Sequence, residues 1–147
     1  KEIEFAIRNN IKVIVDNDHD LKRLEEISNS FNHDIEIMVR FTPGIECHTH
    51  EYIRTGSFDS KFGFGIESLG KLFEVISKTK HIKLTGLHAH IGSQIFELDP
   101  HNDLGKIMVN VILQAKDFGH NIKELNVGGG VDSCFLQKSS NSCSSCS

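Results

Sequence analysis

Two histidines at alternate positions are the first candidates for chemistry, His88 and His90 in the stretch Gly86-Leu87-His88-Ala89-His90-Ile91-Gly92-Ser93-Gln94. Side chains two apart on a β-strand point to the same face, so both imidazoles are expected to project together. The Gly92-Ser93 turn behind them offers backbone amides and a hydroxyl group. The stretch is therefore compatible with binding a metal ion or a phosphate group.

A second glycine cluster, Gly128-Gly129-Gly130, ends a later apolar run. Consecutive glycines after a strand let backbone amides turn toward one anion, and a following helix N-terminus adds a partial positive charge. If this cluster meets Ser93, amides and a hydroxyl could hold one phosphate together. The signatures of a dinucleotide site and of a nucleoside triphosphate loop, Gly-x-Gly-x-x-Gly and Gly-x-x-x-x-Gly-Lys-Ser/Thr, are both absent from the chain.

Zinc is the alternative ligand for the histidine pair, because two imidazoles at a strand end bind zinc in barrel metallohydrolases. No further His or Asp pair follows a neighbouring expected strand, and Cys143 and Cys146 lack a second cysteine pair, so no metal ligand is assigned. We expect His88 to pack in the sheet with one hydrogen bond. We expect His90, just before the turn, to lie flat against an aromatic ligand.

Four helix-then-strand units are expected to position these residues. Short apolar runs predict strands at residues 11–15, 36–41, 82–91 and 122–127. Helical periodicity predicts one helix at residues 1–10, a second that begins with Asp18 as its N-cap, a third at 67–79, and a fourth from a polar linker around Pro100 to near Gly119. The second and third helices are expected to bury apolar stripes, Leu21, Leu24 and Ile27 in one and Leu69, Leu72, Phe73 and Ile76 in the other.

The expected strands are too apolar to face water on one side, which favours a parallel sheet covered by helices. Polar and glycine residues gather after the strands, where parallel α/β folds bind ligands. Both a doubly wound open sheet and a barrel fit this pattern. A complete barrel needs about 250 residues and about eight such units, so this chain would form about half of one.

Composition limits the class of protein: the chain has 147 residues, 38% of them hydrophobic, and a formal net charge of −4. This supports a single core, and the absence of a basic stripe argues against nucleic acid or an anionic membrane as partner. No apolar run approaches the roughly 20 residues that span a bilayer, so we expect a cytoplasmic protein with a small-molecule partner. Because Lys1 is not an initiator methionine, we also expect an upstream part, in which a targeting segment would be invisible.

The stretch 45–65 is long for a connection, and long loops in compact domains usually carry function. Arg40 precedes this stretch and Lys61 lies within it, and both are cations near the expected ligand end. They could pair with a phenolate or a carboxylate, or form structural salt bridges. The segment His48-Thr49-His50-Glu51 within it is expected to anchor the loop by hydrogen bonds.

Taken together, these segments resemble the diaminopimelate decarboxylase family, in the alanine-racemase-like group of pyridoxal-phosphate enzymes. Ordered blocks over roughly 90 residues carry the resemblance, which is more specific than any single motif. The matching blocks are Val39–Gly44, His48–Ile53 with Thr55-Gly56, Asp59–Gly63, Gly86–Gln94 and Leu125–Gly130.

The resemblance implies a partial (β/α)8 barrel over residues 1–130, with pyridoxal 5′-phosphate at the carboxyl ends of the strands. It implies that His90 stacks on the pyridine ring and that Ser93 with Gly128, Gly129 and Gly130 holds the phosphate. The resemblance also implies that Arg40 and Lys61 lie near the pyridine ring. The family also implies a homodimer, an amino-acid substrate and decarboxylation of meso-2,6-diaminopimelate to L-lysine.

The lysine that forms a Schiff base with the cofactor in this family precedes Lys1, so no catalytic residue is assigned within the chain. We therefore expect the chain alone to be inactive. From Val131 to Ser147 the chain becomes rich in serine and cysteine. This tail departs from the family pattern and is expected to be disordered, as the product of a truncation or frame shift.

Two alternatives stay open. The first is another basic amino-acid decarboxylase of the same fold, acting on ornithine or arginine, which the His-Thr-His-Glu loop disfavours. The second is a metal-binding or phosphate-binding barrel protein that uses His88 and His90.

Overall fold

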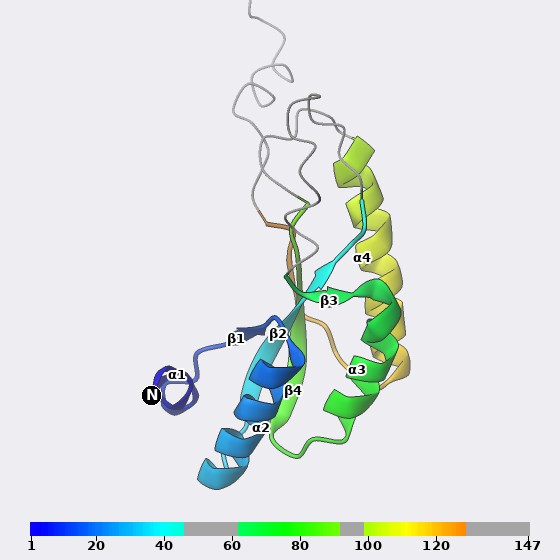
Figure 1. Ribbon diagram of the computed structural model, residues 1–147. Coiled ribbons are helices and arrows are strands. Elements are labelled where there is room, and N and C mark those ends of the chain that lie inside the picture. The colour runs from blue at the N-terminus through cyan, green and yellow to red at the C-terminus, as the bar shows by residue number, and fades with distance from the viewer. Residues whose placement is uncertain (46–61, 92–98, 129–147) are drawn as a thin grey trace, which may run out of the picture.

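The computed structural model describes residues 1–45, 62–91 and 99–128. Their strands form one parallel sheet, shown in Figure 1. Four strands follow one another across it in the order β1 (Val13–Val15), β2 (Ile35–Thr42), β4 (Ile82–Ala89) and β5 (Glu124–Asn126), while β3 (Phe64–Gly65) pairs with the end of β2.

Helices alternate along the chain with β1, β2, β4 and β5, as the sequence pattern predicted. They are α1 (Glu2–Arg8), α2 (Asp18–Phe31), α3 (Leu69–Ser77) after a short 3-10 turn η2 (Ile66–Ser68), and α4 (Asp99–Asp117). Figure 1 shows α3 and α4 lying side by side along the sheet, and the two helices are in contact. No described helix is long and apolar enough to cross a membrane.

One face of the sheet forms the core with the helices. Val15, Val39 and Leu87 on this face are completely buried and belong to one apolar cluster with residues of α2, α3 and α4. The expected apolar stripes are confirmed, with Leu24 of α2 and Phe73 of α3 among the fully buried side chains. The other face carries the alternate residues, and these are the ones that could contact a ligand.

Two helix starts differ from the sequence prediction. Asn17, and not Asp18, is the N-cap of α2, because its extended backbone lets its side chain accept a hydrogen bond from the Asp20 amide at 2.9 Å. Helix α4 begins at Asp99 and includes Pro100, which was predicted to lie in a linker. Proline lacks an amide hydrogen that the first helical turn leaves unpaired anyway, so the helix can start there.

Three strands also differ. Phe64 and Gly65 fall in the stretch predicted as loop, yet they pair with Phe41 and Thr42 of β2. Strand β5 is shorter than predicted, and all three of its residues are exposed. The prediction that every strand is buried on both faces is therefore wrong for β5 and also for β1, in which Ile14 is 47% exposed. These two strands lie at the ends of the order β1-β2-β4-β5.

Charged residues join the first and last strands near their amino ends. Lys12 Nζ donates a hydrogen bond to Glu124 Oε1 at 2.6 Å and lies 3.4 Å from Glu36 Oε2. The hydrogen bond to Glu124 raises the pKa of Lys12 above its ordinary value. The three side chains thus connect β1, β2 and β5.

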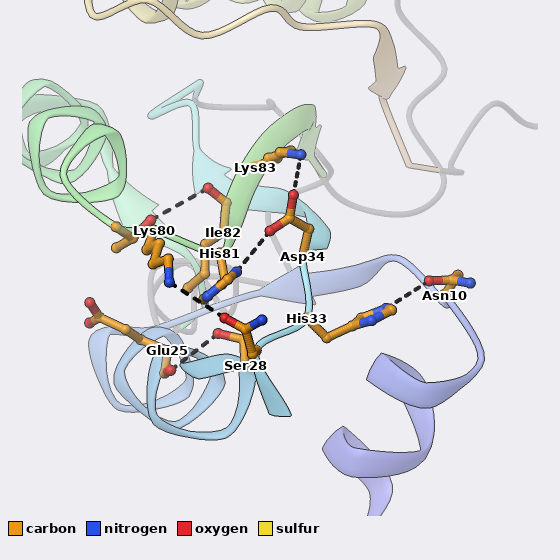
Figure 2. A network of polar contacts seen from close by, with 11 residues as sticks. Asn10, Glu25, Ser28, His33, Asp34, Lys80, His81, Ile82 and Lys83 are labelled. Carbon is orange, nitrogen blue, oxygen red and sulfur yellow. Dashed lines mark hydrogen bonds and ion pairs between the residues drawn. The ribbon is translucent and has the colours of Figure 1, made fainter. Parts of the chain in front are cut away.

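A second polar network lies at the same end of the sheet, where β2 and β4 begin. Figure 2 shows the Asp34 carboxylate between His81 and Lys83, which come from the start of β4. His81 Nδ1 donates to Asp34 Oδ1 at 2.8 Å, and Lys83 Nζ donates to Asp34 Oδ2. Hydrogen bonds from Lys83 and then His81 lower the pKa of Asp34 to about 2.

This lowered pKa predicts a loss of stability in acid. The ordinary value of 3.8 falls to about 2 on folding, so the unfolded chain binds the proton first. The stabilisation is present above about pH 4 and disappears as the pH falls toward 2. We expect Asp34→Asn to flatten this decline, measured as the urea midpoint at successive pH values.

Asp117→Asn is the matched control, because Asp117 is exposed at the end of α4 and has no ion pair within the described residues. It should leave the acid decline unchanged. An equal decline in the wild-type chain and the Asp34→Asn variant would contradict the assignment to Asp34.

Candidate functional site

The register of the sheet brings three polar residues into one row near the carboxyl ends of the strands. Arg40 of β2 is paired with His88 of β4, and His88 is paired with Asn126 of β5. Paired residues of neighbouring strands project to the same face. This row lies on the face opposite Val39 and Leu87, so it is the side of the sheet that the core leaves available.

His90 and Gly128, which the sequence placed in separate clusters, are in contact. A Cβ atom at Gly128 would overlap His90 Nδ1 and lie only 3.1 Å from His90 Cγ. Gly128 also has φ +73°, a backbone conformation that favours glycine. Both steric reasons exclude a side chain at this position, so the glycine turn and the imidazole can share one site.

His88 is half-buried and makes one described hydrogen bond, as the sequence predicted. Its Nδ1 donates to the Asn126 carbonyl oxygen at 3.1 Å, which makes Nδ1 the protonated nitrogen. This bond ties the ends of β4 and β5 together in addition to their ladder.

Asn126 is a polar residue to which sequence reasoning gave no role. Its Oδ1 accepts a hydrogen bond from the Gly128 amide at 2.9 Å. An asparagine that binds the backbone two residues on forms a turn by itself, so Asn-x-Gly after a strand was the available signal. The Gly128 amide is therefore engaged within the chain.

Arg40 lies between an acid and an aromatic ring. Its Nε is 3.9 Å from Asp16 Oδ1 at the end of β1, and its guanidinium carbon is 5.1 Å from the centre of the Phe62 ring. The Asp16 Oδ1 atom is buried and makes no hydrogen bond within the described residues. Gly63 fits tightly here, because a Cβ on it would lie 2.9 Å from the Arg40 carbonyl oxygen. The structural salt bridge that the sequence left open for Arg40 is thus present.

The structure describes three of the residues predicted to bind the cofactor, Arg40, His90 and Gly128. It brings His90 and Gly128 into contact. Arg40 lies on β2, which is the neighbour of β4 and two strands away from β5. Four others, Lys61, Ser93, Gly129 and Gly130, lie outside the described residues, as do the loop 48–52, Cys143, Cys146 and the tail 131–147.

Within the ranges 1–45, 62–91 and 99–128, no group of three His, Cys, Asp or Glu side chains is placed to hold a metal ion. A cofactor that carries both an aromatic ring and a phosphate needs a flat platform next to a turn with space for the anion. The imidazole of His90 beside the side-chain-free Gly128 offers such a platform, which is compatible with the ring of pyridoxal phosphate. The residues predicted to bind its phosphate, Ser93, Gly129 and Gly130, lie outside the described residues.

Comparisons with known proteins all indicate a pyridoxal-dependent decarboxylase. The family model for the pyridoxal-binding domain of pyridoxal-dependent decarboxylases matches residues 1–145. Diaminopimelate decarboxylase of Synechocystis sp. is 45% identical over 137 residues, which cover 93% of this chain and 29% of that enzyme. The Bacillus subtilis enzyme of the same name is 36% identical over 134 residues and is covered to 30%. The chain thus spans less than a third of these relatives' length.

Solved structures support the barrel over the doubly wound sheet. The crystal structure of Helicobacter pylori diaminopimelate decarboxylase in complex with L-lysine matches with a TM-score of 0.77 and 31% identity, covering 88% of this chain and 33% of that one. Alanine racemase of Corynebacterium glutamicum matches with a TM-score of 0.64 at 17% identity, which shows the shared fold alone. The described sheet corresponds to part of their barrel.

Proposed function

Because the chain belongs to the pyridoxal-dependent decarboxylases, through their pyridoxal-binding domain, we propose that it is part of a diaminopimelate decarboxylase. Such an enzyme removes one carboxyl group of meso-2,6-diaminopimelate as carbon dioxide and leaves L-lysine. The observation that carries the proposal is the contact between His90 and Gly128 at the carboxyl ends of neighbouring strands. Curated relatives at 36% and 45% identity support the choice of substrate.

The chain's own residues would bind and orient the cofactor. The His90 imidazole would lie against the pyridine ring, and Gly128 would leave the space that this requires. Ser93, Gly129 and Gly130 would offer a hydroxyl and amides to the phosphate. When bound, pyridoxal phosphate supplies a conjugated ring that takes up the electron pair left as the bond to the departing carboxylate breaks.

Arg40 and Lys61 would add positive charge near the ring. The Asp16 carboxylate and the Phe62 ring hold the Arg40 guanidinium on two sides, so Arg40 would act from a fixed position. A fixed cation stabilises nearby negative charge without having to reorganise during the reaction.

The chain alone would not catalyse this reaction, since the lysine that carries the cofactor would come from outside it.

The edge strand β5 and the residue after it expose apolar side chains, with Leu125 at 49% and Val127 at 50%. Such an edge needs a neighbouring strand. The complete enzyme would be a cytoplasmic homodimer.

A segment exchange tests the proposal. The matching segment of the Synechocystis enzyme is replaced by this chain, which gives a hybrid enzyme whose remaining parts come from the relative. We expect the hybrid enzyme to bind pyridoxal phosphate, seen as a change in cofactor absorbance, and to release carbon dioxide from meso-diaminopimelate. Residues 1–147 alone should release none.

The unmodified Synechocystis enzyme is the positive control, and ornithine and arginine are the competing substrates. A folded hybrid enzyme that binds the cofactor yet prefers ornithine or arginine would overturn the substrate. A folded hybrid enzyme that binds no pyridoxal phosphate would overturn the cofactor role of these residues.

A further inference from the structure

A chain of contacts at the end of the sheet leads from Asn126 to His90. Asn126 is the last residue of β5, and its side chain accepts the hydrogen bond of the Gly128 amide at 2.9 Å. Gly128 in turn approaches His90 so closely that it leaves no room for a Cβ between them. The position of the Asn126 side chain therefore limits where the His90 ring can lie.

The asparagine is itself held in place from the other side. Its carbonyl oxygen accepts the hydrogen bond of His88 Nδ1 at 3.1 Å, and His88 is its partner in the sheet register. His88 and His90 belong to the same segment of chain, two residues apart. The contacts thus form a closed circuit that runs from β4 to β5 and back to the residue after β4.

We propose that Asn126 is a positioning residue that orients the His90 imidazole through Gly128. This inference rests on the proposed function, in which His90 carries the pyridine ring. The Gly128 amide is engaged by Asn126, so Gly128 serves the site by its closeness to His90 and its lack of a side chain. His88 stabilises the same arrangement by fixing the Asn126 backbone.

The test uses the hybrid enzyme and measures affinity for pyridoxal phosphate and for pyridoxal, which lacks the phosphate. Asn126→Ala removes one hydrogen bond, so we expect affinity for both compounds to fall about five- to tenfold. Asn126→Asp keeps an acceptor for the Gly128 amide and should restore the affinity for pyridoxal. Asn121→Ala is the matched control, because Asn121 is exposed before β5 at the opposite end of the strand.

A double-mutant cycle separates positioning from a general structural effect. If Asn126 acts through His90, Asn126→Ala should weaken binding in the wild-type background and have no further effect in His90→Ala. Equal losses in both backgrounds would overturn the inference, as would no loss in the wild-type background. A hybrid enzyme that bound neither compound before any substitution would instead overturn the proposed function.

Discussion

Gly128→Ala in the hybrid enzyme is expected to lower the affinity for pyridoxal phosphate about 10- to 100-fold. The new methyl group would overlap His90 Nδ1, and a non-glycine residue would be strained at φ +73°. Strain of this kind costs about 1–3 kcal/mol, which corresponds to the expected loss if relief of strain displaces the imidazole. Cofactor titration followed by absorbance measures the effect.

Gly119→Ala separates strain from contact. Gly119 also has a positive φ, +86°, but a Cβ there meets nothing within 4 Å. It follows α4 and is far along the chain from His90, so its replacement should cost stability and leave cofactor affinity unchanged. If Gly119→Ala and Gly128→Ala weakened binding equally, the contact with His90 would not be the cause.

Phe41→Ala is expected to destabilise the barrel by about 3–5 kcal/mol. Phe41 is 1% exposed and lies in β2 between Ala89 of β4 and Phe64 of β3. Removing its ring leaves a cavity in the core near the carboxyl end of β2, next in sequence to Arg40. The loss of unfolding free energy should appear in urea denaturation of the hybrid enzyme, followed by circular dichroism.

Phe5→Ala is the matched control, because the Phe5 side chain in α1 is 62% exposed. Replacing an exposed residue usually changes stability by no more than about 0.5 kcal/mol. Comparable destabilisation by the two substitutions would contradict the position of Phe41 in the core.

Periodicity predicted most of the fold, because burial against a sheet imposes it directly. The stripe Leu21, Leu24 and Ile27 is buried as expected, and so is the stripe of α3. The sequence prediction is wrong where a single hydrogen bond or a single neighbouring strand determines the local structure. Asn17 and Asp18 are both good N-caps, and only the backbone angles select Asn17.

Strand β3 was not predicted, because a strand of two residues is too short to show a periodic pattern. Phe64 and Gly65 are a strand only because β2 extends far enough to pair with them. The exposure of β5 could not be read from Leu125 and Val127 either, since their apolar character indicates burial. What covers a strand edge depends on neighbours that its own sequence does not contain.

The residues indicated the parts of the candidate site, and the family resemblance implied that these parts serve one cofactor, but neither specified the contacts between them. The residue types of His90 and Gly128 indicated a ring platform and a tight turn, but their contact depends on the register of β4 with β5. The same register gives Asn126 its hydrogen bond with His88, whereas its hydrogen bond with the Gly128 amide is local. Sequence spacing predicts which face a side chain occupies, whereas contact between distant segments requires the assembled sheet.

The bond between Lys12 and Glu124 has a consequence for the order in which the chain assembles. The two residues are 112 positions apart, so their meeting requires closure of a very large loop. Closing such a loop costs much conformational entropy before any contact compensates for it. Pairing β1 with β2 costs less, because only α2 separates these strands along the chain. During synthesis the ribosome also releases β1 and β2 before β5 exists. We therefore expect β5 to dock after β1 and β2 have paired, and this ion pair to form only then.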